Sequence, residues 1–159
     1  MKQQYICHQG LKSNKKALLR FYKAEHYSAR LIGHDKWYFI SEKDLIIAAV
    51  IVSEIGQAEI QYFLHGLVTS KAYQNRGLAS KLIAHVQLLN PNIVCFADNS
   101  MSPFYLTKQF IKISQQAIKI SLVEGLSLRF FCYMSSKPDL RVFIYQGYNI
   151  HDNSNGEYI

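Results

Sequence analysis

Residues 74–80 combine small side chains with the start of a helix, and this combination suits the binding of an anion. The segment reads Gln74-Asn75-Arg76-Gly77-Leu78-Ala79-Ser80. Gly77 tolerates a positive φ angle and Ala79 has almost no side chain, so a ligand can approach the backbone closely. The first turn of a helix also offers free N–H groups and the positive end of the helix dipole. The pattern therefore predicts an anion site, most naturally for phosphate.

The elements on either side of this segment would hold it in place. Residues 62–68 form an apolar run interrupted by His65 and Gly66, which predicts a strand. Leu78, Leu82 and Val86 recur every four residues, which predicts an amphipathic helix. Gly66 suits a β-bulge that would splay this strand away from the next one. The expected unit is therefore strand, loop and helix.

A second strand and helix follow at residues 92–110. Residues 93–97 predict a short buried strand, and Asp98-Asn99-Ser100 are residues that often cap a helix. Pro103 suits the first turn of a helix, which would carry Phe104 and Tyr105. The polar loop and the tyrosine therefore lie at the ends of two successive strands.

The spacing Gln-x-x-Gly-x-Ala at residues 74–79, between a strand and a helix, resembles the motif of the Gcn5-related N-acetyltransferase (GNAT) family. The resemblance implies an α/β (α+β) fold with a mixed, mostly antiparallel central sheet of about six to seven strands and helices on both faces. It implies that the loop holds the pyrophosphate of acetyl-coenzyme A, and that the pantetheine arm enters the gap between the splayed strands. The coenzyme-binding residues carried over are Leu67, Val68, Thr69, Gln74, Asn75, Arg76, Gly77, Leu78, Ala79, Ser80 and Asn99.

In the family, a tyrosine near the start of the second helix protonates the departing thiolate, and Tyr105 occupies that position. A tyrosine of pKa about 10 carries its proton at neutral pH and can supply it to a thiolate of pKa about 8.5, at a cost of about 2 kcal/mol. Packing of an aromatic side chain is the alternative for Tyr105. The family usually has a glycine where this chain has Gln109, at the point where the helix would end in a left-handed conformation.

An amine acceptor of pKa about 10.4 must lose a proton before it attacks a thioester. The candidate bases are His65, Glu59, Asp98 and, through water, Gln61. His65 has the most suitable intrinsic pKa and lies on the strand that would face the thioester, although it could instead be a structural residue. By the logic of an oxyanion hole, the backbone N–H of Val68 is expected to polarise the carbonyl.

Further elements are expected along the rest of the chain. A first helix is predicted over about residues 13–30, and a hairpin joins strands at 37–41 and 45–53. The second of these strands should be central because it is apolar on both faces. A strand is predicted over 57–70. Residues 111–113 and 140–145 predict the last two strands, and Ser121 to Glu124 reads as a capping box that opens a helix to about residue 133. Such a helix is an insertion relative to the family, and it would shape the acceptor site or a dimer face.

Composition is consistent with one domain of 159 residues, predicted at 1–148 with a polar tail at 149–159. Hydrophobic residues make up 49% of the chain, its longest apolar run is eight residues, and its start is too polar for a signal peptide. A cytoplasmic protein without membrane association is expected. The three cysteines lack the spacing of a zinc site, so reduced thiols and no metal are expected.

The formal charge of +7 has two interpretations. Basic residues around the loop would attract acetyl-coenzyme A, which is itself a polyanion. Nucleic acid is a less favoured partner, because no motif for it is present. The expected function is direct transfer of acetyl from acetyl-coenzyme A to an amine by a monomer or homodimer. The alternatives are a non-catalytic acyl-coenzyme A sensor and an acetyltransferase associated with RNA or the ribosome. The acceptor could be a small amine, an amino acid, a peptide N-terminus or a protein lysine.

Overall fold

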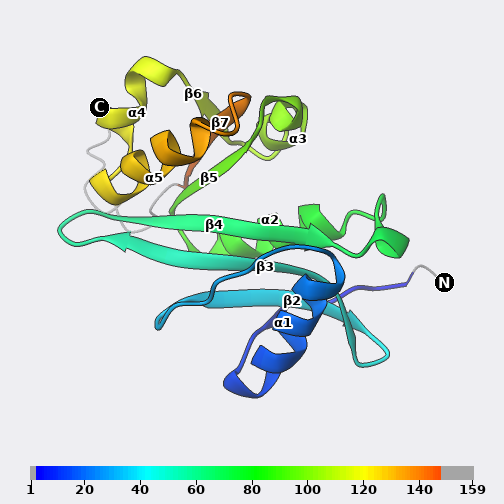
Figure 1. The fold of residues 1–159 in the computed structure, drawn as a ribbon. Coiled ribbons are helices and arrows are strands. Elements are labelled where there is room, and N and C mark those ends of the chain that lie inside the picture. Colours follow the sequence, from blue (N-terminus) through cyan, green and yellow to red (C-terminus); the bar gives the residue numbers. More distant parts are fainter. Residues whose placement is uncertain (1–2, 148–159) are drawn as a thin grey trace, which may run out of the picture.

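The computed structural model describes residues 3–147, which build one seven-stranded sheet with helices packed against it (Figure 1). The order across the sheet is β1-β2-β3-β4-β5-β7-β6. Every neighbouring pair is antiparallel except β4 and β5, which are parallel. The predicted mixed, mostly antiparallel sheet is therefore confirmed. The strands are β1 (His8–Gln9), β2 (Lys36–Glu42), β3 (Leu45–Gly56), β4 (Ile60–Thr69), β5 (Asn92–Asp98), β6 (Ile111–Ile113) and β7 (Leu140–Gln146).

Helices cover both faces of the sheet, as predicted (Figure 1). On one face, α2 (Leu78–Leu89) and α3 (Ser102–Leu106) pack against the sheet in a cluster that includes Leu82, Val50 and Phe143. On the other face, α1 (Lys15–Ala24) covers β3, while α4 (Ile118–Ser121) and α5 (Glu124–Met134) cover β5 and β7. Two separate helical layers therefore share this second face, with space between them.

The β2–β3 hairpin is found where the sequence predicted it. Strand β3 lies between β2 and β4 in the sheet. Its residues from Ile47 to Ser53 are buried without interruption, as expected for a strand covered on both faces. Lys43 and Asp44 form the turn with φ angles of 49° and 65°, a conformation typical of tight hairpins. This rigid hairpin is the neighbour against which β4 pairs.

The predicted end of the first helix at about residue 30 is wrong, because α1 ends at Ala24. His26 takes a left-handed conformation with a φ angle of 57°, and the Tyr27 N–H donates to the Tyr22 carbonyl at 2.9 Å. This is the hydrogen-bond pattern of a helix that closes on a left-handed residue. Residues 27–35 are thereby released as a loop that runs over the sheet.

The predicted capping box at Ser121 is also wrong, although the helix itself is present. Ser121 is the last residue of α4, and α5 begins at Glu124 without a side-chain cap. The buried side chain of Gln61 holds this junction instead, since its Nε2 donates to the Ser121 carbonyl and its Oε1 accepts from the Val123 N–H, both at 2.8 Å. A long-range contact replaces the local cap that the sequence suggested.

Helices α4 and α5 are inserted between β6 and β7, and these two strands still pair with each other. The predicted tail at 149–159 and the predicted domain end at 148 lie outside the described residues. Within residues 3–147, no helix has the length and apolar character needed to cross a membrane. No group of three or more potential metal ligands occurs in the same range.

Candidate active site

The parallel strands β4 and β5 separate from each other part of the way along β4. They pair only where Tyr62 to Leu64 lie opposite Ile93 to Cys95, although β4 continues to Thr69. A β-bulge at Gly66 and Leu67 accompanies the separation, because these two residues lie opposite the single residue Val50 of β3. The bulge predicted at Gly66 is therefore confirmed, and it opens one side of β4.

Gly66 meets three constraints that only glycine satisfies together. Its φ angle is 61°, and a Cβ atom there would lie 3.1 Å from the Tyr22 hydroxyl and 3.3 Å from the Tyr27 ring. The Tyr22 hydroxyl donates a 2.7 Å hydrogen bond to the Gly66 carbonyl inside the protein. Burial raises the pKa of Tyr22 well above its usual value, so this hydroxyl keeps its proton. Helix α1 thereby fixes the position of the bulge.

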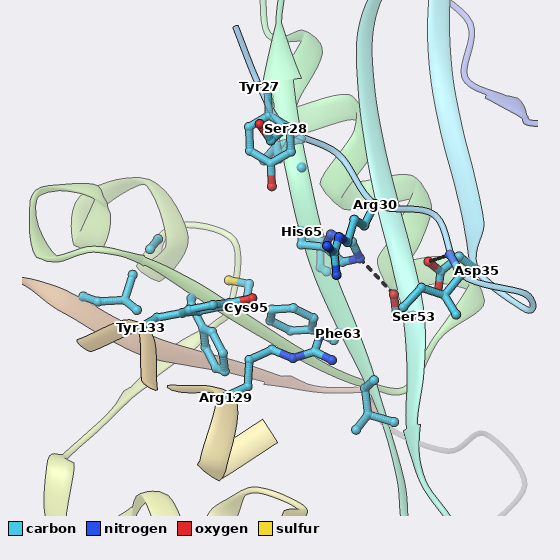
Figure 2. Close-up of a pocket in the computed structure, with 18 of the residues that line it drawn as sticks. Tyr27, Ser28, Arg30, Asp35, Ser53, Phe63, His65, Cys95, Arg129 and Tyr133 are labelled. Atoms are coloured by element: carbon cyan, nitrogen blue, oxygen red, sulfur yellow. Dashed lines mark hydrogen bonds between the residues drawn. The ribbon is translucent and has the colours of Figure 1, made fainter. Parts of the chain in front are cut away.

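The separated strands open into a cavity of about 720 Å³, which Figure 2 shows in close-up. Residues of β4 and β5, among them Leu67 and Cys95, line it. The loop after α1, helix α5 with the loop after it, and Tyr105 from α3 complete the lining. Residues far apart in the sequence therefore surround a single space.

The loop between β4 and α2 has the backbone conformation that the sequence suggested. Asn75 and Gly77 have φ angles of 63° and 78°, and Gly77 immediately precedes α2. No side chain caps α2, and the first bond reaching back to Gly77 comes from the Lys81 N–H. A Cβ atom on Gly77 would meet nothing within 4 Å, so the approach to these backbone N–H groups is open. Such a helix start can hold a phosphate group.

Two basic residues of this region bind the N-terminal segment. Arg76 donates to the Tyr5 hydroxyl at 3.0 Å and lies over the Tyr73 ring at 4.9 Å, while Lys81 Nζ donates to the Tyr5 carbonyl at 2.8 Å. Gln74 points back along β4, where its Nε2 lies 3.5 Å from the Thr69 carbonyl. The side chains of Gln74, Arg76 and Lys81 thus contact protein groups.

The side chain of Tyr105 is almost fully enclosed, with 5% of its surface exposed, and it lines the cavity. Its ring stacks on Phe143 at 5.0 Å and meets Phe110 edge-on at 5.4 Å. Burial and the nearby Cys95 thiol raise the pKa of Tyr105 well above its usual value, and burial likewise raises the pKa of Cys95. Tyr105 is therefore a fixed hydroxyl that keeps its proton at neutral pH.

His65 also lines the cavity, on the same strand as Leu67. Its Nε2 is 2.8 Å from the Ser53 hydroxyl, drawn as a dashed line in Figure 2, and its ring stacks on Phe63 at 5.1 Å. Burial lowers the pKa of His65 to about 4, so the ring is neutral at pH 7. It can accept a proton only from a group that has become strongly acidic.

The other candidate bases do not enter the cavity. Gln61 is fully engaged at the α4–α5 junction, and Glu59 lies in the exposed turn between β3 and β4. The Asp98 side chain accepts a hydrogen bond from the Ser100 N–H. Hydrogen bonding to Ser100 holds the pKa of Asp98 below its usual value. Among the expected bases, His65 is the one that lines the same cavity as Tyr105 and Leu67.

The strand register favours Leu67 rather than Val68 as the backbone donor toward the gap. The Ser70 N–H donates to the Ile47 carbonyl on β3 at 2.7 Å, and Val68 pairs with Ala49 on the same strand. N–H groups two residues apart on a strand point toward the same neighbour, so the Val68 N–H faces β3. The Leu67 and Thr69 N–H groups then face the open side of β4.

Asn99 lies outside the cavity lining. Its Oδ1 accepts from Lys112 Nζ at 3.1 Å, and its N–H donates to the Asp139 carbonyl at 2.8 Å. Conversely, the sequence did not single out Arg129 and Tyr133, which line the cavity from α5. Their spacing of four residues on a helix whose core residues include Leu126 and Phe130 was a signal that these two side chains share another face.

Comparison with protein families matches residues 8–87, half of the chain, to the acetyltransferase (GNAT) family. The matched part runs from β1 into α2 and contains the bulge and the loop. A comparison with curated proteins found no match.

Solved structures resemble this chain at the level of the fold. An N-acetylglutamate synthase from Neisseria gonorrhoeae, complexed with coenzyme A and N-acetyl-glutamate, matches 94% of this chain with a TM-score of 0.68 and 13% identity. This chain spans 36% of that protein, about a third of its length. NAA60 from Arabidopsis thaliana, in complex with a bisubstrate analogue, has a TM-score of 0.62 and 12% identity, over 90% of this chain and 98% of that one. An acyl-CoA N-acyltransferase from Pseudomonas aeruginosa has a TM-score of 0.61 and 12% identity, over 89% and 99%.

Proposed function

Because the chain belongs to the GNAT acetyltransferase family, we propose that it transfers an acetyl group from acetyl-coenzyme A directly to an amine. The observation that carries this proposal is the cavity between the separated strands, which brings the Tyr105 hydroxyl and the open side of β4 together. The solved relatives include complexes with coenzyme A, which supports acetyl-coenzyme A as the co-substrate. One of these structures holds N-acetyl-glutamate and another a bisubstrate analogue, and at 12–13% identity they do not assign the acceptor here.

In the proposed reaction, the phosphates bind at the start of α2 and the thioester lies in the gap beside Leu67. The Leu67 N–H stabilises the oxygen that becomes negative when the amine attacks the carbonyl carbon. The C–S bond then breaks, and Tyr105 gives its proton to the leaving thiolate. The amine attacks directly, and no protein nucleophile is needed.

The nitrogen becomes strongly acidic once it bonds to the carbonyl carbon, and at that stage a neutral imidazole can take its proton. His65 is neutral at pH 7 and its ring is held by Ser53 and Phe63. We assign His65 this late proton transfer rather than the initial deprotonation of a free ammonium group. The acceptor loses its first proton to solvent through the open cavity.

The test uses the purified protein in two steps. Thermal unfolding with and without acetyl-coenzyme A, with adenosine as control, should show a rise of several degrees at saturating ligand. Release of free thiol from acetyl-coenzyme A, measured with a panel of amines, should then depend on the added amine. Binding without amine-dependent release would favour a sensor of acyl-coenzyme A, and absence of binding would refute the proposal.

A further inference from the structure

The cavity contains more positive than negative side chains, which is unexpected for a site that only binds a protonated amine. Arg30, Arg129 and Lys137 line it, against the carboxylates of Asp35 and Glu54. The Asp35 carboxylate already accepts a 2.8 Å hydrogen bond from the Ile32 N–H within the loop. The local excess of positive charge therefore favours a ligand that brings a negative charge.

Arg129 is the best placed of the three cations to bind such a group. It is half-buried on α5 and lies over the Phe63 ring with its Cζ 5.3 Å from the ring centre. Figure 2 shows its guanidinium group extending beside Phe63 within the cavity. Within residues 3–147, no hydrogen bond or ion pair from its side chain to a protein group is found. A guanidinium group has five donors in a planar fork that fits a carboxylate, and here they are available.

The Phe63 ring connects Arg129 to the proposed reaction centre. The centre of the Phe63 ring is 5.1 Å from the centre of the His65 ring and 5.3 Å from Arg129 Cζ. The His65 ring and the Arg129 guanidinium group are therefore at most roughly 10 Å apart. For an acceptor that lies between the two groups, allowing roughly 3 Å for a hydrogen bond at each end leaves about 4 Å between an amine at His65 and an anion at Arg129. An acceptor that bridges the two groups in this way is compact.

We propose that the acceptor is a small amine that carries a carboxylate a few bonds from its nitrogen, as in a free amino acid, and that Arg129 binds this carboxylate. This inference rests on the proposed acetyltransferase function and names its substrate class. The same cations disfavour a protonated amine in the cavity, which helps the bound acceptor to become neutral before it attacks. Arg129 is thus the specificity-determining residue of the acceptor side.

The experiment compares acids with their matched amides. Glycine, alanine, aspartate, glutamate and phenylalanine are assayed as acceptors, each beside its α-carboxamide, by thiol release from acetyl-coenzyme A. We expect at least one acid to be acetylated with a kcat/KM at least tenfold above that of its amide. In Arg129→Gln the KM for that acid should rise at least tenfold and the ratio of kcat/KM for the acid to that for its amide should fall toward one, while the Kd of acetyl-coenzyme A stays unchanged.

The control is Arg20→Gln, which removes the same charge from the exposed surface of α1 and should behave as the wild-type protein. A second readout needs no turnover, since with coenzyme A present an N-acetylated amino acid should raise the melting temperature more than its amide does. Equal responses to acids and amides in both assays, or equal effects of the two arginine variants, would overturn the inference. If the wild-type protein did not bind acetyl-coenzyme A, the proposed function itself would instead be refuted.

Discussion

The two sides of the cavity are built in different ways. The coenzyme side, residues 60–89, is one continuous segment of strand, loop and helix that presents backbone groups at Leu67 and at the start of α2. The acceptor side combines the loop of residues 27–35 with α5 and the loop after it, and it presents side chains such as Arg129. A site made of backbone leaves a local pattern of glycines and spacings, whereas a site made of side chains from distant segments does not.

The family match covers the two sides unequally. It includes residues 8–87, which hold nearly all of the coenzyme side and the loop of residues 27–35, while Tyr105, Arg129 and Tyr133 lie beyond it. The segment that we propose binds the coenzyme is therefore in the matched part. Of the proposed acceptor side, the matched part contains the loop but not α5.

The largest expected effect is the loss of coenzyme binding when Gly77 is replaced. In Gly77→Val, the branched side chain at a φ angle of 78° should distort the loop and block the N–H groups of α2, which raises the Kd of acetyl-coenzyme A by about 100-fold or more. Calorimetric titration measures it. Gly33→Val is the matched control, because Gly33 also has a positive φ angle and open space around it but lies in the loop on the acceptor side. Unchanged binding in Gly77→Val would show that the loop does not hold the coenzyme.

The next effect should separate chemistry from binding. Tyr105→Phe removes the proposed proton donor from a packed site, so kcat should fall about 10- to 100-fold while the Kd of acetyl-coenzyme A is unchanged. Single-turnover thiol release gives the rate. Tyr133→Phe, which removes a hydroxyl from the acceptor side, should change the KM of the acceptor and not kcat. If Tyr105→Phe kept its full turnover, Tyr105 would be a packing residue.

The third prediction concerns the pH dependence of stability. The pKa of His65 is about 4 in the folded protein and about 6.5 in the unfolded chain, so the unfolded chain binds the proton first as the pH falls. The free energy of unfolding should thus decrease between pH 6.5 and pH 4, by about 3 kcal/mol for this group. In His65→Gln this loss should be absent, whereas the control His34→Gln, at an exposed position of the cavity, should keep it. Urea titrations of the three proteins at four pH values measure this change. The prediction would be contradicted if the free energy of unfolding fell equally with pH in all three proteins.

Sequence reasoning predicted the strand, bulge and helix of residues 60–89, and it located the proposed acceptor side only as segments. The bulge at Gly66 and the helix start after Gly77 could be predicted because each needs a particular residue type at a particular position. The end of α1 at Ala24 could not, because histidine rarely takes the left-handed conformation that His26 adopts. The start of α5 depends on Gln61, more than sixty positions away, and a local capping pattern cannot reveal such a contact.

A smaller loss of stability should follow when the hydrogen bond between α1 and the bulge is removed. Tyr22→Phe leaves the buried Gly66 carbonyl without its 2.7 Å hydrogen bond, which should lower the free energy of unfolding by about 1–2 kcal/mol. Thermal unfolding measures this loss. Tyr38→Phe is the control, since Tyr38 is equally buried but no hydrogen bond from its hydroxyl is found among residues 3–147. Because the bulge separates β4 from β5, Tyr22→Phe should also weaken acetyl-coenzyme A binding, and equal effects of the two variants would show that α1 does not hold the bulge.

The smallest effect tests the departure from the family at the end of α3. Gln109 has a φ angle of 68°, so it keeps the left-handed conformation that the usual glycine would take, at a cost of roughly 1 kcal/mol. Gln109→Gly should relieve this strain, and it should raise the free energy of unfolding by about 0.5 kcal/mol after the added entropy of the unfolded chain is counted. Lys108→Gly, one residue earlier and without a positive φ angle, should lower the stability instead. Chemical denaturation of the three proteins side by side resolves the signs. If Gln109→Gly were destabilising, the Gln109 side chain would stabilise the fold by more than its backbone conformation destabilises it. The helix end that positions Tyr105 would then depend on that side chain.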